Sequence, residues 1–421
     1  MPIGGVPLQF STTTIMNISR GGTPMTSPLD GIRILDLTQV QAGPSCTQIL
    51  AWMGADVIKI EQPGVGDRTR RERAINPDID SHYFLVFNAN KRSVTLDLKS
   101  ERGREVFLRM VELADIVVEN YAPGQMDRFD LGFDVLKQAN DKIIFCAIKG
   151  YGTYGPNAHI KSFEHIAQAM SGAMSANGEA ENEPQFVAPG VGDSGTGLHA
   201  AIGMMAAIRQ RDNTGESQRV EVSMQDGIVN LMRIRMIDTL NTNEPVDRRG
   251  NRVWGGPPFI YPCNPGGPND YVAVVLSGDS WDTILALAGR ADLIGDDRFD
   301  TQEARIKHSA EVEAIMKTWT MSKTKHEVMK ELADLGIPVG AVQDTVEVFN
   351  DPHLEAREMI VDTHDPARGD YKLIGCPIKI ESNHVELKVP PQLGEHSDEV
   401  LASLLGMEDS ELAELREAGV I

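Results

Sequence analysis

The chain has 421 residues, of which 41% are hydrophobic and 24% charged, and its formal net charge is -21. This length exceeds one core and predicts two or three domains, since a domain averages about 150 residues. The acidic balance argues against a nucleic-acid partner, because phosphate binding needs a clustered basic face, and no apolar run reaches the about 18 residues of a membrane span.

The cysteines and the N-terminal residues indicate the compartment. The cysteines stand far apart without a C-x-x-C pair, at Cys46, Cys146, Cys263 and Cys376. They indicate neither a metal site nor a disulfide framework, so a reducing cytoplasm is expected. Residues 1–27 are rich in Gly, Ser and Thr, and their only basic residue, Arg20, follows the weakly apolar part, unlike in a secretory signal. We expect a flexible N-terminal extension there, or a true start at Met25.

From residue 32 onwards, short β-type runs alternate with helical patterns. Strands are expected at 32–38, 55–61, 92–98, 115–120, 142–150 and 219–224, and helices at 43–54 and 100–114. Pro44 suits a first helical turn, and Ser100 could cap its helix. This alternation predicts an α/β fold with a Rossmann-like parallel sheet covered on both faces. The turn after the first strand lacks G-x-G-x-x-G, which makes a dinucleotide dehydrogenase unlikely.

The local composition of the chain changes near residue 240, where Gly, Pro and Asn become frequent. We expect a large domain at 28–225, a smaller α+β domain at 226–340 with a strand at 271–276, and a C-terminal part at 341–421 that returns to the large domain. The motif "GIPVGAV" at 336–342 is expected to mark the return.

The stretch "PGVGDSGTG" places Asp193 among glycines, just before a run with helical periodicity. Aspartate is a preferred N-cap residue, so Asp193 could begin a helix. The tetrapeptide "DSGT" also occurs in pepsin-like proteases, but these need two such loops and this chain has one. A third reading makes Asp193 a nucleophile, kept ionised by the helix N-terminus, with the glycines leaving space for a bulky electrophile.

A series of motifs supports the third reading. They are "VQAGP" (40–44), "NKRSVTLDLK" (90–99), "VENYAPGQMDRFDLGF" (118–133), "KSFEHIAQAMSGAM" (161–174), "GDSGTG" (192–197), "GIPVGAV" (336–342) and "LGEHSDEVL" (393–401). In content and order they resemble the class III CoA-transferases of the CaiB/BaiF type, over nearly the whole chain from residue 28. The resemblance implies an interlocked homodimer whose large domain binds CoA and is built from N- and C-terminal parts.

The resemblance also implies the chemistry. Asp193 falls on the family's nucleophile, which attacks an acyl-CoA to give a mixed anhydride and then an aspartyl-CoA thioester that an acceptor carboxylate resolves. Formyl-CoA is the leading donor and oxalate the leading acceptor. CoA and acyl-CoA are then substrates, and neither a permanently bound cofactor nor a metal is expected.

The resemblance carries the CoA contacts onto the ends of the expected strands or just beyond them. These positions are Gln41, Ala42, Leu96, Asp97, Leu98, Lys99, Asn120, Tyr121, Ala122, Arg128 and Lys161. Gln41 is also expected near the reacting carbonyl. Lys99, Arg128 and Lys161 could meet phosphate charge or be solvated surface cations. The basic run at 67–73 has the same two interpretations.

Two positions depart from the family pattern. Gln62 stands where the family can carry an arginine, so a contact at the adenine end could be missing. The loop expected over the site is "WGGPPF" at 254–259, with Gly255 and Gly256 as its substrate-facing residues. It lacks the longer glycine run followed by glutamine that one member of the family carries, which bears on substrate choice.

Two alternatives remain. An α-methylacyl-CoA racemase of the same fold needs a His and Asp pair, but Phe163 and Glu164 stand at those positions and His165 lies further along. Glu164 could instead orient Asp193 or cap the helix that follows it. A non-catalytic CoA-binding regulator would keep the sheet but would have no need of Asp193.

Overall fold

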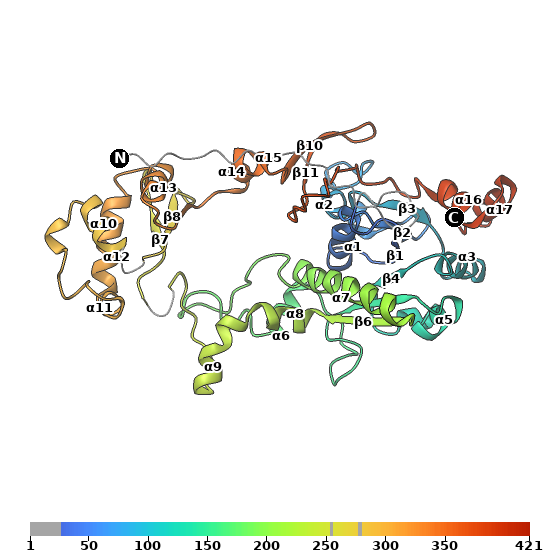
Figure 1. The fold of residues 1–421 in the computed structure, drawn as a ribbon, viewed down its shortest axis with the longest axis horizontal. Coiled ribbons are helices and arrows are strands. Elements are labelled where there is room, and N and C mark those ends of the chain that lie inside the picture. The colour runs from blue at the N-terminus through green and yellow to red at the C-terminus, as the bar shows by residue number, and fades with distance from the viewer. Residues whose placement is uncertain (1–26, 253–255, 277–279) are drawn as a thin grey trace.

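The computed structural model describes residues 27–252, 256–276 and 280–421 (Figure 1). The expected N-terminal extension lies outside these residues except for Ser27, and so does Gly255. Among the described residues, no helix combines the length and the apolar character that crossing a membrane requires. All four cysteines are buried free thiols.

A six-stranded sheet forms one end of the molecule (Figure 1). Its strands are β1 (Arg33–Asp36), β2 (Asp56–Glu61), β3 (Arg92–Thr95), β4 (Ile116–Glu119), β5 (Ile144–Lys149) and β6 (Gln218–Ser223). They lie in the order β3-β2-β1-β4-β5-β6, and every neighbouring pair is parallel. The predicted α/β class and parallel sheet are confirmed. All the strands therefore end at one edge, where ligands gather in such folds.

Successive strand residues enter two different cores, as the two-residue period of a strand requires. Ile34 packs beneath α1 (Ala42–Trp52) and α7 (Asp193–Thr214), whereas Leu35 packs beneath α3 (Glu101–Val111), α5 (Phe133–Ala139), α16 (Ser397–Leu405) and α17 (Asp409–Glu417). Both residues are fully buried, and each such side chain contributes about 1.5–3 kcal/mol. Helices thus cover both faces of the sheet.

Local signals fix several helix ends. Ser100 Oγ accepts a hydrogen bond from Gly103 N at 3.0 Å, so the expected cap of α3 is confirmed. Pro44 lies in the first turn of α1, where its missing N–H costs nothing. Gly215 ends α7 in the left-handed conformation, with φ of 73°, which glycine adopts without strain.

A second, smaller sheet lies at the opposite end of the molecule (Figure 1). Strands β7 (Ile260–Pro262), β8 (Tyr271–Val274) and β9 (Val339–Ala341) pair antiparallel in that order. Helices α10 (Trp281–Leu287), α11 (Gln302–Lys307), α12 (Ser309–Thr320) and α13 (Lys325–Asp334) accompany it. The motif "GIPVGAV" supplies β9, the last strand of this sheet along the chain, so the chain leaves the small sheet where the return was expected.

The remaining elements link the two sheets or flank the larger one, except for the 3-10 turn at Ala291–Leu293, which packs beside the smaller one. They are α2 (His82–Asn88), α4 (Gln125–Arg128), α6 (Glu164–Met170), α8 (Met224–Leu231), α9 (Ile237–Thr242), α14 (Thr345–Phe349), α15 (Pro352–Ala356), β10 (Ile360–Asp365), β11 (Gly369–Ile374) and short 3-10 turns at Arg68–Arg70, Arg233–Met236 and Ala291–Leu293. β10 and β11 form an antiparallel hairpin. After it the chain reaches β3 again, where Thr95 N donates to Ser397 Oγ at 3.0 Å.

Candidate active site

A cavity of about 270 Å³ opens at the carboxyl edge of the large sheet. The turns after β1, β4 and β5, the segment before α6 and the start of α7 form its walls. Of the residues expected from the sequence, it brings together Gln41, Ala42, Asn120, Tyr121, Ala122, Lys161 and Asp193. Its other lining residues are Arg68, from the basic run at 67–73, and residues that were not singled out as site residues: Gln39, Val40, Pro123, Ile148, Lys149, Gly150, Ile160, Ser162, Phe163 and Met224.

Asp193 is the first residue of α7, and Gly192 holds the N-cap position. The carboxylate makes no capping hydrogen bond, so the expected capping role is wrong. Glu164 caps α7 instead. Its Oε1 accepts from Gly192 N at 2.8 Å and its Oε2 from Asp193 N at 2.6 Å. Glu164 therefore contacts Asp193 through the backbone, and it caps α7 rather than its own helix, α6.

The carboxyl of Asp193 is difficult to ionise. Burial, and secondly the negative charge of Glu164, raise its pKa from 3.8 to about 7, while Arg68 opposes the shift. The expectation that the helix N-terminus keeps Asp193 ionised is therefore wrong, because Glu164 already occupies the first N–H groups and adds a like charge. A carboxylate with a raised pKa is a stronger base and nucleophile than an ordinary one.

Two of the glycines beside Asp193, Gly192 and Gly197, permit close packing within the protein. A Cβ at Gly197 would lie 2.3 Å from Ser45 Oγ and 2.6 Å from Ala42 O, where α7 touches α1. A Cβ at Gly192 would lie 3.1 Å from Glu164 Oε1. These glycines let the protein itself approach the start of α7.

Gln41 lies immediately before α1, and its side-chain amide is held at both ends. Its Nε2 donates to Ser194 Oγ at 3.2 Å, and its Oε1 accepts from the Tyr83 hydroxyl at 3.3 Å. Burial, and then the charge of Asp193, raise the pKa of Tyr83. Tyr83 lies on α2, more than a hundred residues from Asp193, and no motif in the sequence marked it.

A buried ion pair shapes the turn after β4. Lys149 Nζ lies 2.7 Å from Glu119 Oε2 and donates to Tyr121 O at 2.7 Å, while Tyr121 N donates to Glu119 Oε2 at 2.8 Å. The side-chain amide of the neighbouring Asn120 bonds the backbone of Gln39. Its Oδ1 accepts from Gln39 N at 2.9 Å, and its Nδ2 donates to Gln39 O at 2.8 Å. The side chain of Asn120 is thus occupied by the protein.

The basic run at 67–73 divides into two roles. Arg68 is about half exposed and lines the cavity, with its guanidinium 5.3 Å from the Phe163 ring centroid. Arg70 is buried against Glu61 at 2.7 Å and lies over Phe84 at 3.7 Å. Arg68 thus remains a candidate for ligand charge, whereas Arg70 holds the loop together.

Several expected CoA contacts lie away from this cavity. The segment Leu96–Lys99 follows β3 at the same sheet edge, but the side chains of Leu96 and Leu98 belong to the core, and Asp97 Oδ1 accepts from Lys99 N. Lys99 Nζ lies 3.5 Å from Gln62 Oε1, so the position that departs from the family pattern adjoins an expected contact. Arg128 is exposed on α4, where its Nη2 donates to Gln125 Oε1 at 2.7 Å.

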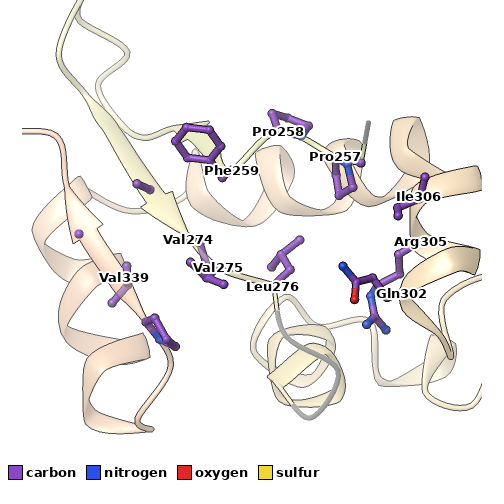
Figure 2. A pocket seen from close by; sticks show the side chains of 14 residues that line it. Pro257, Pro258, Phe259, Val274, Val275, Leu276, Gln302, Arg305, Ile306 and Val339 are labelled. Atoms are coloured by element: carbon purple, nitrogen blue, oxygen red, sulfur yellow. The ribbon is translucent and has the colours of Figure 1, made fainter. Parts of the chain in front are cut away.

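A second cavity, of about 570 Å³, lies beside the small sheet (Figure 2). Gly256 lines this cavity and not the one that holds Asp193. Figure 2 shows mainly apolar side chains facing it, among them Phe259, Val275 and Leu276, with Arg305 at one end. Within one chain, the described part of the expected substrate loop therefore lies apart from Asp193.

The described residues also bear on a metal site and on the racemase alternative. No group of His, Cys, Asp and Glu among them is arranged to hold a metal ion. His165 is exposed on α6, and Phe163 and Glu164 occupy the positions where a racemase needs its His and Asp pair. A racemase is therefore not favoured.

Comparisons with known proteins agree with this geometry. The model of CoA-transferase family III matches residues 29–397. A formyl-CoA:oxalate CoA-transferase from Streptomyces avermitilis is 41% identical over 94% of this chain and 100% of its own, and one from Rhodopseudomonas palustris (strain BisA53) is 39% identical over 94% and 98%. A crystal structure of a CaiB/BaiF family protein from Brucella suis, 30% identical, superposes with a TM-score of 0.81 over 90% of this chain and 99% of that one.

Proposed function

The chain belongs to CoA-transferase family III and is a CoA-transferase, and we propose that it moves CoA from formyl-CoA to oxalate with Asp193 as the nucleophile. The observation that carries the proposal is the half-buried carboxyl of Asp193 in the wall of the cavity, with its pKa raised to about 7. The specificities named for relatives of about 40% identity support the choice of donor and acceptor.

The reaction proceeds in four balanced exchanges at one carboxyl. An oxygen of Asp193 attacks the formyl carbon, the C–S bond breaks, and CoA leaves as a thiolate. The thiolate then attacks the aspartyl carbonyl, which releases formate and forms an aspartyl-CoA thioester. Oxalate displaces the thiolate to give a mixed anhydride, and the thiolate attacks its oxalyl carbon. The products are oxalyl-CoA and the free Asp193 carboxylate.

The neighbouring residues assist these steps. The Gln41 amide, which now donates to Ser194 Oγ, turns to the reacting carbonyl oxygen as negative charge develops there. One such donor accelerates a reaction by about 100- to 1,000-fold. Arg68 and Lys161 meet the charge of oxalate or of the CoA phosphates. The backbone of Leu96–Lys99 and of the turn after β4 contacts the rest of CoA.

The working form is a homodimer. Large apolar side chains are exposed from α7 to α9, among them Leu198 at 46%, Ile202 at 61%, Ile234 at 65% and Leu240 at 82%. Exposed apolar surface of this extent commonly marks a protein interface. Light scattering on the purified protein tests this: a species of twice the 46.1 kDa chain mass is expected, and a monomer at micromolar concentration would contradict it.

Chemical trapping tests the nucleophile. The protein is incubated with formyl-CoA and then with hydroxylamine, which converts an aspartyl anhydride or thioester to a hydroxamate that mass spectrometry locates. We expect the label on Asp193 and complete loss of transfer in Asp193→Ala. Asp409→Ala is the matched control, because Asp409 is also the first residue of its helix, α17, but is exposed.

Other outcomes distinguish the alternatives. A racemase would exchange deuterium from solvent into the α-carbon of an α-methylacyl-CoA without a trapped adduct, and a CoA-binding regulator would give neither result. A panel of small carboxylic acids offered with one donor identifies the acceptor. If acids other than oxalate react fastest, the chemistry stands and the proposed substrate is wrong.

A further inference from the structure

The turn between β1 and α1 contains a strained residue. Val40 has φ of 69°, in the left-handed region, and it is the only β-branched residue with such an angle among the positive-φ residues in the described part of the chain. Glycine is the usual residue in this conformation, and a branched side chain makes it costly. Such a conformation persists only where the surroundings impose it, and it often marks a functional site.

Side chains from outside the turn hold its backbone. Asp67 accepts from Val40 N, with its two oxygens at 3.2 and 3.1 Å. Lys59 Nζ donates to Thr38 O at 2.7 Å. Gln39 between them is held through both its backbone N–H and its carbonyl by Asn120. The backbone is thus held at Thr38, Gln39 and Val40, immediately before Gln41.

Asp67 and Lys59 also hold one another. Their charged atoms lie 3.0 Å apart, and both side chains are completely buried. Asp67 Oδ1 accepts in addition from Thr69 N at 3.0 Å and Thr69 Oγ1 at 2.8 Å. Burial opposes both charges, yet Lys59 lowers the pKa of Asp67, and Asp67 raises that of Lys59. Apolar residues often stabilise a core as well as a buried ion pair does, so stability alone gives a weak account of this pair.

The turn delivers Gln41 to the candidate active site. Gln41 follows Val40 directly, and its amide lies between Tyr83 and Ser194, the residue next to Asp193. We propose that Asp67, supported by Lys59, is a positioning residue that holds Val40 in the left-handed conformation and so aims the Gln41 amide at the reacting carbonyl. This inference rests on the proposed function, because it needs the Asp193 cavity to be the site of transfer.

The hydrogen bond from Val40 N to Asp67 is called the clamp below, and its loss has a specific kinetic consequence. Without an acceptor for its N–H, Val40 relaxes toward the extended region that a branched residue prefers, and Gln41 turns away from the cavity. Misplacement of a catalytic group by about 1 Å can cost about 100-fold in rate. We therefore expect Asp67→Ala to lower kcat by about 10- to 100-fold, with a much smaller change in KM for the CoA donor.

A double-mutant cycle with Val40→Gly tests the mechanism. Glycine adopts a positive φ without help, so it removes the need for the clamp. The kcat loss caused by Asp67→Ala is measured in the natural chain and again in combination with Val40→Gly. We expect the loss to shrink to less than about threefold in the second background. An equal loss in both backgrounds would overturn the proposal.

Controls separate positioning from stability. Glu347→Ala removes a partly buried ion pair, with Lys325 at 2.7 Å, that belongs to the small-sheet end of the molecule. It should lower the melting temperature as Asp67→Ala does, leave kcat unchanged, and gain nothing from Val40→Gly. If Asp67→Ala does not fold, the isosteric Asp67→Asn replaces it. Its single acceptor oxygen cannot serve both Lys59 and Thr69, so a smaller kcat loss with the same dependence on Val40 is expected.

Hydrogen exchange gives a readout independent of activity. The peptide that covers residues 37–42 should exchange faster in Asp67→Ala than in the natural chain. In the double variant with Val40→Gly, part of this protection should return. If the natural chain shows no CoA transfer while exchange behaves in this way, the proposed function fails and the clamp stands. If transfer is normal and exchange is unchanged by Asp67→Ala, the clamp fails and the function stands.

Discussion

Ionisation of Asp193 should destabilise the folded protein, and replacing it with asparagine should therefore stabilise it at high pH. The pKa of this carboxyl rises from 3.8 to about 7 on folding. A folded-state pKa above the unfolded value means that the folded chain binds the proton more tightly, so stability falls as the pH rises from about 4 to about 7 and then levels off. Asp193→Asn removes this loss.

The magnitude follows from the size of the shift. One pKa unit corresponds to about 1.4 kcal/mol, so a shift of about three units gives about 4 kcal/mol at full ionisation. Part of this is already present at pH 5, because the unfolded carboxyl is ionised there. The advantage of Asp193→Asn over the natural chain should therefore grow by about 2–3 kcal/mol between pH 5 and pH 8.

Urea unfolding followed by circular dichroism at the two pH values provides the measurement. Asp409→Asn is the control, because Asp409 is also the first residue of its helix, α17, but is exposed. Its effect should be within about 0.5 kcal/mol at both pH values. If the effect of Asp193→Asn is equally independent of pH, the carboxyl is not held in the state that the structure indicates.

Three further results are expected. In the natural chain, kcat/KM for transfer should fall about tenfold per pH unit below about pH 7, because the nucleophile must be ionised, and a flat profile down to pH 5 would contradict this. Glu164→Gln removes the like charge beside Asp193, so the same fall should begin at lower pH. Gly197→Ala should cost about 1–3 kcal/mol in urea unfolding, because its Cβ would lie 2.3 Å from Ser45 Oγ, whereas Gly340→Ala, with nothing within 4 Å, should be nearly neutral.

The large sheet could be predicted from the sequence because its signals are local. The alternation of Ile34 and Leu35 between two cores follows from strand geometry alone, and Ser100 caps α3 through a residue three positions away. The motif at 336–342 was expected at the end of the small domain, but its pairing partner was not predicted. A short apolar strand does not reveal its partner, and Val339 pairs with Val274 of the small sheet.

The site could be predicted only in part, because its decisive contacts are distant in the sequence. Asp193 and Gln41 were expected in one place, and both line the cavity. That Glu164 would cap α7, 28 residues away, depends on how α6 is placed, which no local pattern states. The same holds for the hydrogen bond from the Tyr83 hydroxyl to Gln41 Oε1 and for the one from Val40 N to Asp67. The sequence shows the types of these residues but not which atoms they contact in the fold.

The start of α7 shows how Asp193, the proposed nucleophile, stands at the beginning of a helix without serving as its cap. A helix N-terminus ordinarily stabilises an anion, and an aspartate stabilised in this way is a weak nucleophile because its negative charge is already satisfied. Glu164 takes the first N–H groups of α7, so the helix is capped without the help of Asp193. Asp193 thereby stands at the start of the helix while its carboxylate stays poorly stabilised. The raised pKa costs folding stability, and it also makes the ionised carboxylate a stronger nucleophile. A single carboxylate could not meet both needs, which gives a physical reason for two acidic residues at this site.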